Sequence, residues 1–469
     1  MRGYAQILKD RLTFHWFSGF IVLLALLPLP FGANRPWASD LMGVLTSLLT
    51  LGLCLELYRA KTFWPAGAPV KRLTASAFLL LAVGVWAFLQ TQSWMPEGSH
   101  HPLWKEVQNM PEAFAGSISI DPDLFGESFV RLMSYAFCFL LAFWGGRDGD
   151  NALRLLKVLA AASVVYALYG LLMQSTGLRM ILWFPKWAYA DCVTSTFVNK
   201  NSYATYAGLG LQTCLVLLWQ HLKRQKPLDL SRQSRQAAIL ERIATRDVFY
   251  FLPVVIVLGA LLFTGSRAGI SFSLVGCCVL LFALAANRRW SWKRWLPVVL
   301  GGTVLLLGLN LFGDAGFLDR LDRDQLKTDL PDRLAGYRIA LRAIAGNPWL
   351  GFGLGAFENA FRLYRDPTLP LWFQHAHNDY LEAALELGIP AALMLFTAIA
   401  LLVSCCVTGV WRRRRQEIFP ALAVSATATV ALHSLVDFSL QMPAIAATYA
   451  ALLGLGVAQS WSSRTERSS

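Results

Sequence analysis

The sequence contains a succession of apolar runs, and several exceed the roughly 18 residues that suffice to cross a lipid bilayer. Because the bilayer core offers the backbone no hydrogen-bond partners, a spanning segment is either a helix or a strand of a closed barrel. These runs are continuous rather than alternating, which favours helices. With 55% hydrophobic and 15% charged residues, the chain is too apolar for an ordinary soluble domain. We therefore predict an all-α fold, a polytopic membrane helical bundle that forms a single domain over residues 1–469.

We predict about twelve membrane-spanning helices from these runs. Seven of the eight cysteines fall inside them and only Cys192 lies outside, which indicates small buried apolar residues rather than a disulfide framework. The predicted spans are Trp16–Phe31, Ala38–Leu57, Leu73–Gln92, Glu127–Trp144, Leu153–Ser175, Asn201–His221, Val248–Phe263, Ala268–Ala286, Trp295–Phe312, Ile389–Thr408, Phe419–Leu435 and Met442–Trp461.

Basic residues gather at alternate ends of these spans. Most of the 42 lysines and arginines fall on the side of the N-terminus, as in the pair Lys71 and Arg72 and the run Arg412–Arg415. Loops rich in Lys and Arg stay in the cytoplasm, so both termini are predicted to be cytoplasmic and the other loops to face outward. The net charge of +13 is thus mainly a topology signal. It does not indicate a nucleic-acid partner, because no single basic patch with interleaved aromatic residues is formed.

Two of the predicted outer segments are long. Ser93–Gly126 is acidic and rich in proline, and residues 313–378 join the ninth and tenth spans. A connection of that length is either functional or disordered, and the second segment shows a helical pattern. We predict that it forms a subdomain with an amphipathic helix lying against the membrane surface or the bundle. The apolar face is Leu334, Tyr337, Leu341 and Ile344, and Arg338 and Arg342 fall on a different face.

Three cations lie at the outer ends of predicted spans: Arg131, Lys200 and Arg267. A cation at this depth is costly unless it is solvated or paired, so each is a candidate site residue, although long basic side chains also reach the head groups without any further role. Arg267 follows Gly265 and Ser266 in an open turn where backbone N–H groups and a guanidinium could bind one anion.

The segment QHAHNDYLEAALELGIPAA, Gln374–Ala392, places a group of polar residues just before a predicted span. Asp379 or Asn378, with Glu382 completing a capping box, is predicted to begin a short helix that ends at Gly388. Capping leaves His375 and His377 unexplained. An imidazole there can accept and return a proton near neutral pH.

A zinc site is a weaker interpretation of the two histidines. The HxH spacing could ligate zinc, but His100, His101 and His433 lie in other loops and no third ligand is close in sequence. We therefore predict neither a metal nor a cofactor. A histidine base, several cations at the outer boundary and no acidic metal-binding cluster favour a reaction in which arginines hold a phosphate-bearing leaving group. At that boundary the natural candidate is a lipid-linked diphosphate sugar.

Four motifs, in this order, resemble the superfamily of O-antigen ligases and Wzy-type O-antigen or exopolysaccharide polymerases, which are integral-membrane glycosyltransferases. They are STFVNKNSYATYAGL, TGSRAG, DRLAGYRIALRAIAGNPWLGFGLGAF and HAHNDYLEAALELGIPA. The resemblance covers roughly Thr194–Met442. One departure is Lys200, since many relatives have proline or arginine between the two asparagines.

The resemblance implies a GT-C-like bundle in the bacterial inner membrane with a periplasmic active site. It implies metal-independent, inverting transfer of a glycan from a polyprenyl (undecaprenyl) diphosphate donor, in lipopolysaccharide or other polysaccharide biosynthesis. By position in the motifs, His377 would be the general base and Arg267 would bind the diphosphate, assisted by Lys200 and by Arg338 or Arg333. His375 and Asn378 would support the site.

The segment HSLVDFSLQMP, His433–Pro443, forms a further polar cluster that is more typical of the polymerases in this superfamily. His433 and Asp437 would line the acceptor path, or Asp437 would only cap and pair. The acceptor stays open among a lipid A-core sugar, the end of another lipid-linked repeat unit and a protein hydroxyl. The alternative function is a membrane transporter of an anionic or lipid-linked solute, which would place charges near the membrane midplane in two similar halves.

Overall fold

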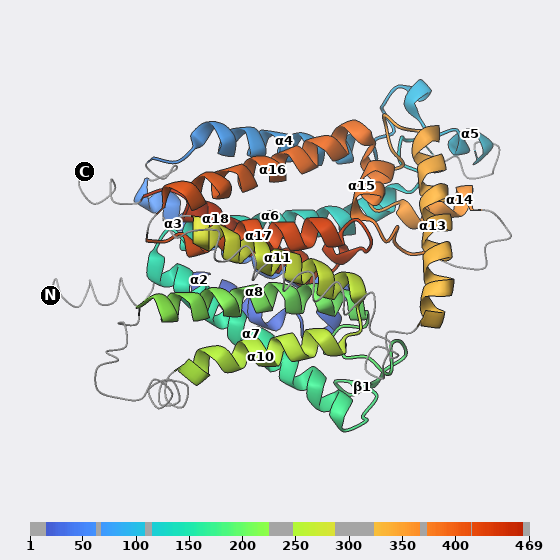
Figure 1. The fold of residues 1–469 in the computed structure, drawn as a ribbon. Helices are drawn as coiled ribbons and strands as arrows, with labels where there is room; N and C mark the ends of the chain where they lie inside the picture. Colours follow the sequence, from blue (N-terminus) through green and yellow to red (C-terminus); the bar gives the residue numbers. More distant parts are fainter. Residues whose placement is uncertain are drawn as a thin grey trace, which may run out of the picture.

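The structure is a computed structural model that describes residues 16–61, 67–107, 115–224, 247–286, 323–365, 373–413 and 415–462. Long helices that run roughly side by side form most of it (Figure 1). The all-α prediction is confirmed for these residues, where the strands are confined to one hairpin, β1 (Met180–Ile181) and β2 (Phe184–Pro185). The long helices of the bundle are α2 (Trp16–Leu26), α3 (Pro36–Ala60), α4 (Val70–Leu89), α6 (Phe125–Gly145), α7 (Gly149–Ser175), α8 (Lys200–Arg224), α10 (Val248–Phe263), α11 (Arg267–Ala286), α16 (Ile389–Arg412), α17 (Ile418–His433) and α18 (Pro443–Ala458).

Each predicted span coincides with one of these helices except Trp295–Phe312, which lies outside the described residues. Among the described residues, six helices are long and apolar enough to cross a membrane: α3, α4, α6, α7, α11 and α16. Four apolar helices are shorter, namely α2, α10, α17 and α18. The first predicted span extends too far, because Pro28 and Pro30 follow the end of α2 and cannot continue a helix. A polytopic membrane bundle is supported, and the number of about twelve spans stays a prediction.

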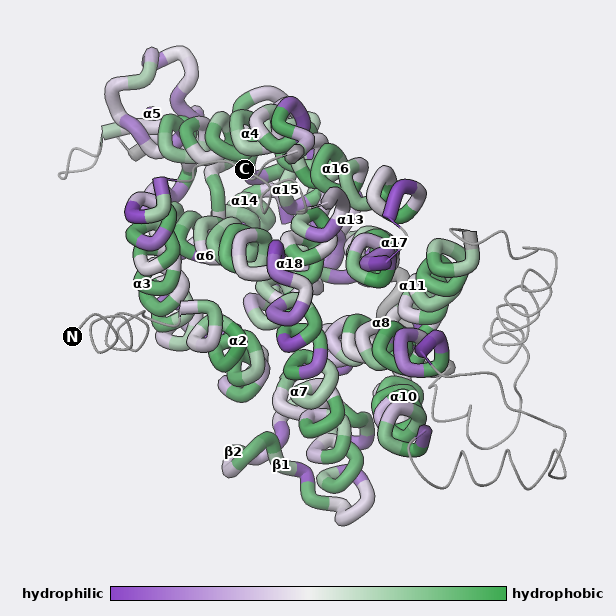
Figure 2. Tube along the Cα trace, turned by 90° about the vertical axis from the view of Figure 1, so that its left-hand side faces the viewer, coloured by the Kyte–Doolittle hydropathy of each residue, from purple (hydrophilic) through white to green (hydrophobic). Residues whose placement is uncertain are grey.

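Helix α18 lies at the centre of the bundle (Figure 2), and every one of its residues is buried. It packs against α6, α16 and α17, and α11 packs against α8 and α17. Small residues permit this approach, as in other membrane helices. A Cβ atom added to Gly454 of α18 would lie 2.4 Å from the carbonyl oxygen of Phe139 in α6. The bundle core is therefore built by close contact between helix backbones.

Three helices from the long second segment and its continuation gather at one end of the bundle: α13 (Arg323–Gly346), α14 (Phe357–Tyr364) and α15 (Asp379–Leu387). Helix α13 runs across the direction of the bundle helices (Figure 1). We call this end the cap end. A separate small core holds it together, formed by Ile120, Ile339, Ala340, Ala343, Ile344, Phe352, Ala356, Phe357, Ala360, Phe361, Ala376 and Leu385. The described part of the predicted 313–378 subdomain thus shares its core with Ile120 from the first long segment and Leu385 from α15.

The glycine-rich turn before α14 is required by the close contact between these two segments. Gly351, Gly353 and Gly355 have φ angles of 71°, 105° and 87°, which side-chain-bearing residues rarely adopt. A Cβ atom on Gly353 would lie 2.1 Å from the hydroxyl of Ser119. The N–H of Ile120 donates to the carbonyl of Phe352 at 3.0 Å. The GFGLG sequence therefore lets the two predicted outer segments meet.

The cap core covers only part of the predicted apolar face of α13. Leu334 and Leu341 are 46% and 53% exposed, whereas Ile344 is buried as expected. The helix instead turns Ile339, Ala340, Ala343 and Ile344 toward the cap core. The packing of α14 and α15 selects this face, and neighbouring elements are not visible in the periodicity of a single segment.

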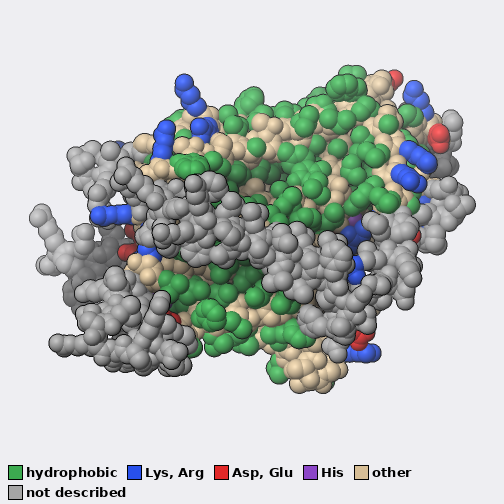
Figure 3. Space-filling model, viewed as in Figure 1, with side chains coloured by type: hydrophobic (Ala, Val, Ile, Leu, Met, Phe, Trp, Pro, Cys, Tyr) green, Lys and Arg blue, Asp and Glu red, His purple; other side chains and the backbone are tan. Residues whose placement is uncertain are grey.

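The opposite end of the bundle, which we call the basic end, collects alternate helix termini. Lys223 in the last turn of α8 forms an ion pair with Glu417, which directly precedes α17. Arg147 before α7 donates to the carbonyl of Ala458 in α18 at 2.7 Å, and Arg72 of α4 donates to Thr408 of α16 at 2.9 Å. The face drawn in Figure 3 shows hydrophobic side chains between these ends, with Lys and Arg toward both. The described loops therefore alternate between the two ends as predicted.

Candidate active site

Asn378 is the N-cap of helix α15. Its backbone is extended, and its side-chain oxygen accepts from the N–H groups of Tyr380 and Leu381, both at 3.0 Å. Its amide nitrogen donates to the carbonyl of Leu435 at 2.9 Å. Of the two predicted N-caps, Asn378 is therefore correct and Asp379 is the first helical residue. This N-cap also fixes α15 to the loop that follows α17.

Glu382 does not complete the predicted capping box. Its carboxylate is 2% exposed and reaches back past the helix start. One oxygen accepts from the N–H of Ala376 at 2.8 Å, and the other contacts Nδ1 of His375 at 2.8 Å. Burial alone would lower the pKa of His375, but the charge and hydrogen bond of Glu382, together with the charges of Glu386 and Asp379, outweigh it and raise that pKa above its ordinary value. The capping-box prediction is wrong at this residue, because Asn378 lies four positions before Glu382 and a capping box needs three.

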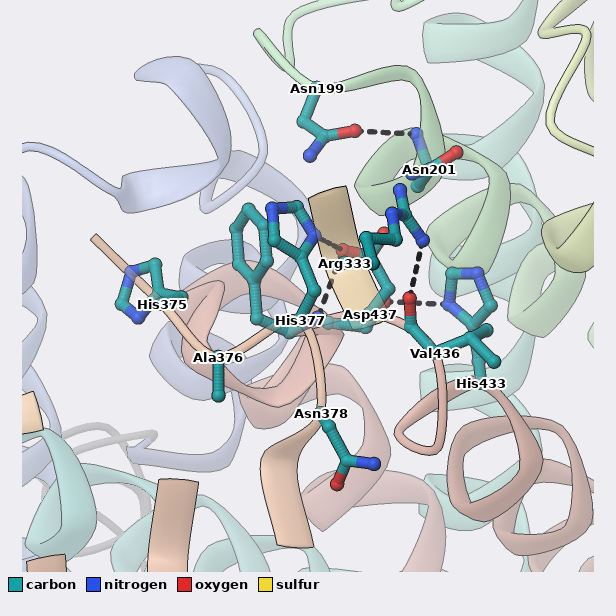
Figure 4. Close-up of polar contacts among 12 residues, drawn as sticks. Asn199, Asn201, Arg333, His375, Ala376, His377, Asn378, His433, Val436 and Asp437 are labelled. Atoms are coloured by element: carbon teal, nitrogen blue, oxygen red, sulfur yellow. Dashed lines mark hydrogen bonds and ion pairs between the residues drawn. The ribbon is translucent and has the colours of Figure 1, made fainter. Parts of the chain in front are cut away.

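His377 lies beside the buried carboxylate of Asp437 (Figure 4). Nδ1 of His377 is 3.1 Å from Oδ1 of Asp437, and the imidazole is 20% exposed. The hydroxyl of Tyr337 in α13 donates to the carbonyl of His377 at 2.8 Å. The φ angle of His377 is 49°, in the left-handed region that costs a side-chain-bearing residue about 1–3 kcal/mol. The surroundings therefore hold this histidine in an unfavourable backbone conformation.

Asp437 is suited to hold His377 in one tautomer. Its side chain is 1% exposed, and its Oδ1 also accepts from the N–H of Phe438 at 3.0 Å. Burial would raise the pKa of Asp437, but the hydrogen bond from His377 and the positive charges of His433, His377 and Arg333 outweigh burial and hold that pKa below its ordinary value. An ionised Asp437 accepts a proton-bearing Nδ1, which leaves the lone pair of Nε2 available to take a proton. No described residue forms a hydrogen bond with that Nε2.

The structure brings Arg333 to this site and keeps Arg338 away from it. A guanidinium nitrogen of Arg333 donates to the carbonyl of Val436 at 2.6 Å, next to Asp437 (Figure 4). Arg333 and Tyr337 are one helical turn apart and face the same loop. Arg338 lies on the exposed face of α13, roughly 100° around the helix from Tyr337. Of the two loop arginines predicted to assist with the diphosphate, the geometry favours Arg333.

The two motifs that carry Lys200 and Arg267 are in direct contact. Lys200 begins α8 and Arg267 begins α11. The hydroxyl of Ser266 donates to the side-chain oxygen of Asn201 at 2.7 Å. Gly269 permits this, since an added Cβ atom would lie 2.4 Å from Cβ of Ala204. Both cations therefore start neighbouring helices at the cap end, and Lys200 also lies 5.5 Å from the ring centre of Tyr189.

His433 and Arg131 lie in different surroundings from His377. The imidazole of His433 is buried at the end of α17, where its Nδ1 contacts the hydroxyls of Thr205 at 2.5 Å and Ser439 at 2.8 Å. It thereby joins α8 to the loop that carries Asp437. Arg131 forms an ion pair with Glu127 one turn earlier on α6. Neither residue forms a described hydrogen bond with His377.

Sequence reasoning missed three contributors to the site: Tyr337, Glu382 and Phe438. The ring of Phe438 stacks on His375 with centres 4.8 Å apart and meets His377 edge-on at 4.7 Å. The helical pattern places Tyr337 on an apolar face, and the capping-box pattern explains Glu382. Neither pattern predicts that the hydroxyl of Tyr337 or the carboxylate of Glu382 contacts the segment around His377. Within the described ranges, no group of three or more His, Cys, Asp or Glu side chains is placed to hold a metal ion.

Comparison with known proteins supports the resemblance seen in the motifs. Residues 252–396 match the family model described as O-antigen ligase. This range includes Arg267, Arg333 and His377, whereas Lys200 and Asp437 lie outside it. No curated protein matches the chain. Over residues 252–396, the chain is therefore similar to the O-antigen ligase family.

Proposed function

We infer that this protein is a membrane-embedded, inverting glycosyltransferase that uses a polyprenyl-diphosphate-linked glycan as donor and a sugar hydroxyl as acceptor. The reaction would take place on the periplasmic face of the bacterial inner membrane, in O-antigen or surface polysaccharide assembly. The family match supports this class of reaction. The observation that carries the proposal is the pairing of His377 with the buried carboxylate of Asp437 at the cap end.

In the proposed reaction, Nε2 of His377 removes the proton from the acceptor hydroxyl. The acceptor oxygen attacks the anomeric carbon of the donor from the face opposite the diphosphate, whose bond to that carbon breaks, so the configuration inverts. The electron pair of the broken bond leaves with the polyprenyl diphosphate. Asp437 orients the imidazole and stabilises the imidazolium that forms. General-base assistance of this kind contributes about 10²–10⁴-fold to a rate.

The diphosphate requires positive charge as it leaves. Arg267 and Lys200 begin two helices that are joined by the Ser266–Asn201 hydrogen bond, and in this proposal both bind the same anionic group. Arg333 would contribute from the side of Asp437. A planar guanidinium binds a phosphate through two parallel hydrogen bonds, so arginines supply this function without a metal ion. The acceptor hydroxyl would belong to a lipid A-core sugar or to another lipid-linked repeat unit.

The role of His377 can be tested with purified protein, a lipid-diphosphate donor and an acceptor glycan. His377→Ala should lower the transfer rate by about 10²–10⁴-fold at unchanged protein yield. Asp437→Asn, which keeps the shape but favours the wrong imidazole tautomer, should also lower it, by up to about 10⁴-fold. Glu358→Gln is a control, since Glu358 pairs with Arg362 on the outside of α14. A His377→Ala protein that transfers glycan at nearly the control rate rules out His377 as the base.

The role of Arg267 is tested separately through donor affinity. Arg267→Lys keeps the positive charge but loses the planar pair of donors, so the donor KM should rise about tenfold or more while the acceptor KM is unchanged. Arg338→Lys is a matched control on the exposed face of α13 and should leave the donor KM within about twofold. Equal donor KM values for Arg267→Lys and the unsubstituted protein would remove Arg267 from the diphosphate site.

A further inference from the structure

The backbone conformation of His377 needs external support. A φ of 49° at a residue with a side chain persists only where surrounding contacts over-determine it. Four contacts act on His377 itself: the Asp437 carboxylate on its ring, the Tyr337 hydroxyl on its carbonyl, and the rings of Phe438 and Phe373, which meet its ring edge-on with centres 4.7 Å and 5.8 Å away. None of these four contacts involves His375 or Ala376, the two residues that directly precede His377.

Glu382 supplies that missing contact. Its two carboxylate oxygens bind the two residues that precede His377, one through the N–H of Ala376 and the other through Nδ1 of His375, both at 2.8 Å. The carboxylate is 2% exposed and projects from the first turns of α15, a helix that Asn378 fixes at its start. A buried acceptor that binds a backbone N–H on one side and a ring nitrogen on the other limits motion along both directions of the chain.

The carboxylate of Glu382 is also connected to His377 through the aromatic rings of His375 and Phe438. His375, held by Glu382, stacks on Phe438 with the ring planes 25° apart, and Phe438 meets the ring of His377 at 75°. Phe438 therefore lies between the two histidines and directly follows Asp437 in the chain. A shift of His375 would move the surface against which His377 rests. Two physical routes, the main chain and the aromatic rings, thus lead from Glu382 to His377.

We propose that Glu382 is a positioning residue for the transfer reaction, and that it acts by fixing the segment His375–His377 so that Nε2 of His377 meets the acceptor hydroxyl. This role rests on the proposed function, in which His377 is the base. Glu382 itself contacts neither donor nor acceptor. Displacement of a catalytic group by about 1 Å can cost about 10²-fold in rate, so the effect should lie in the rate of the chemical step.

The predicted signature is a division between kcat and KM. Glu382→Ala removes both contacts and should lower kcat by about 10²-fold, with both KM values within about threefold of the unsubstituted protein. Glu382→Gln keeps an oxygen for the N–H of Ala376 but loses the ionic partner of His375, so it should lower kcat by about tenfold. Glu358→Gln, a change of the same type outside the site, should leave kcat unchanged. Thermal unfolding of each variant in detergent reports whether the fold is retained.

Several results would overturn the proposal. A kcat for Glu382→Gln equal to that of the control would show that the ionic contact does not position the base. A raised KM with unchanged kcat would place Glu382 in substrate binding instead. If Glu382→Ala does not fold, the kcat and KM values of Glu382→Gln decide the question alone. His377→Ala, measured alongside, separates the two ideas: its retained activity would refute the assignment of the base, whereas its loss together with normal Glu382 variants would refute only the positioning role.

Discussion

The carboxyl of Asp379 connects α15 to the loop that carries Asp437 and should make folding depend on pH. Its Oδ2 accepts from the hydroxyl of Ser434 at 2.6 Å and from the N–H of Leu440 at 3.3 Å, and the side chain is buried. Burial raises the pKa of Asp379 from 3.8 to about 8; the Ser434 hydrogen bond opposes this shift and the charge of Glu382 adds to it. The folded state thus binds this proton more tightly than the unfolded state, so stability falls as pH rises between these two values.

Replacing Asp379 by Asn tests this expectation. The amide mimics the protonated carboxyl, so Asp379→Asn should unfold at a higher temperature than the unsubstituted protein near pH 8. Burial and the charge of Glu382 also raise the pKa of Glu386 to about 8, and the pKa of His375 is raised as well, so the substitution should remove part of the pH dependence rather than all of it. Asp123→Asn, an exposed change of the same type, should leave the pH dependence of unfolding intact. A slope that is identical in Asp379→Asn and the unsubstituted protein would contradict the assignment.

At single residues, the sequence predicted which segments carry polar groups better than it predicted their partners. Asn378 as a helix cap was foreseen because caps are local in sequence. The partners of His375 and His377 were not, since Asp437 is 60 residues from His377 along the chain and Glu382 had a plausible local role. The exposed position of Arg338 and the buried position of His433 likewise depend on packing between segments distant in sequence. The proposed roles of these residues stay predictions.

Helix packing in the bundle depends on glycines that admit no side chain. Gly454→Ala would place a methyl group 2.4 Å from the carbonyl of Phe139, and a backbone atom cannot move aside as a flexible side chain can. Overpacking of this kind costs typically 1–3 kcal/mol, so the unfolding temperature should fall by several degrees. Gly259→Ala in α10 is the matched control, because no atom lies within 4 Å of its added Cβ and alanine favours a helix by about 0.5–1 kcal/mol over glycine. Equal unfolding temperatures for the two variants would refute the close contact of α18 with α6.

The helices themselves were largely predictable, since a long apolar run leaves few alternatives in a membrane. The hairpin of β1 and β2 was not expected, because two-residue strands leave no alternation to detect in the sequence. The sequence predicted only part of the face that α13 buries, because the neighbouring helices α14 and α15 determine which of its residues are covered. Periodicity therefore identifies an amphipathic helix but does not identify which of two apolar stripes is covered.

Across the whole molecule, the alternation of basic loops agrees with the two ends of the bundle. Residues that the sequence placed on one side, such as Arg72, Arg147 and Lys223, meet helix termini at the basic end. His377, Arg333, Lys200 and Arg267 lie at the cap end. The distribution of positive charge is the basis for assigning a compartment to each end. This assignment determines whether the proposed donor must be delivered to the outer face before it reacts.

The orientation can be measured with cysteine probes in sealed right-side-out membrane vesicles. In a Cys192→Ser background, Glu97→Cys places a thiol on the exposed cap end and Lys71→Cys places one on the exposed basic end. If the cap end is periplasmic, a membrane-impermeant maleimide should label Glu97→Cys directly and Lys71→Cys only after the membrane is permeabilised. The unsubstituted background shows the labelling due to the remaining cysteines. The reverse pattern would place His377 in the cytoplasm, where the glycan-bearing donor would have to be used before it crosses the membrane, and the proposed periplasmic reaction would fail.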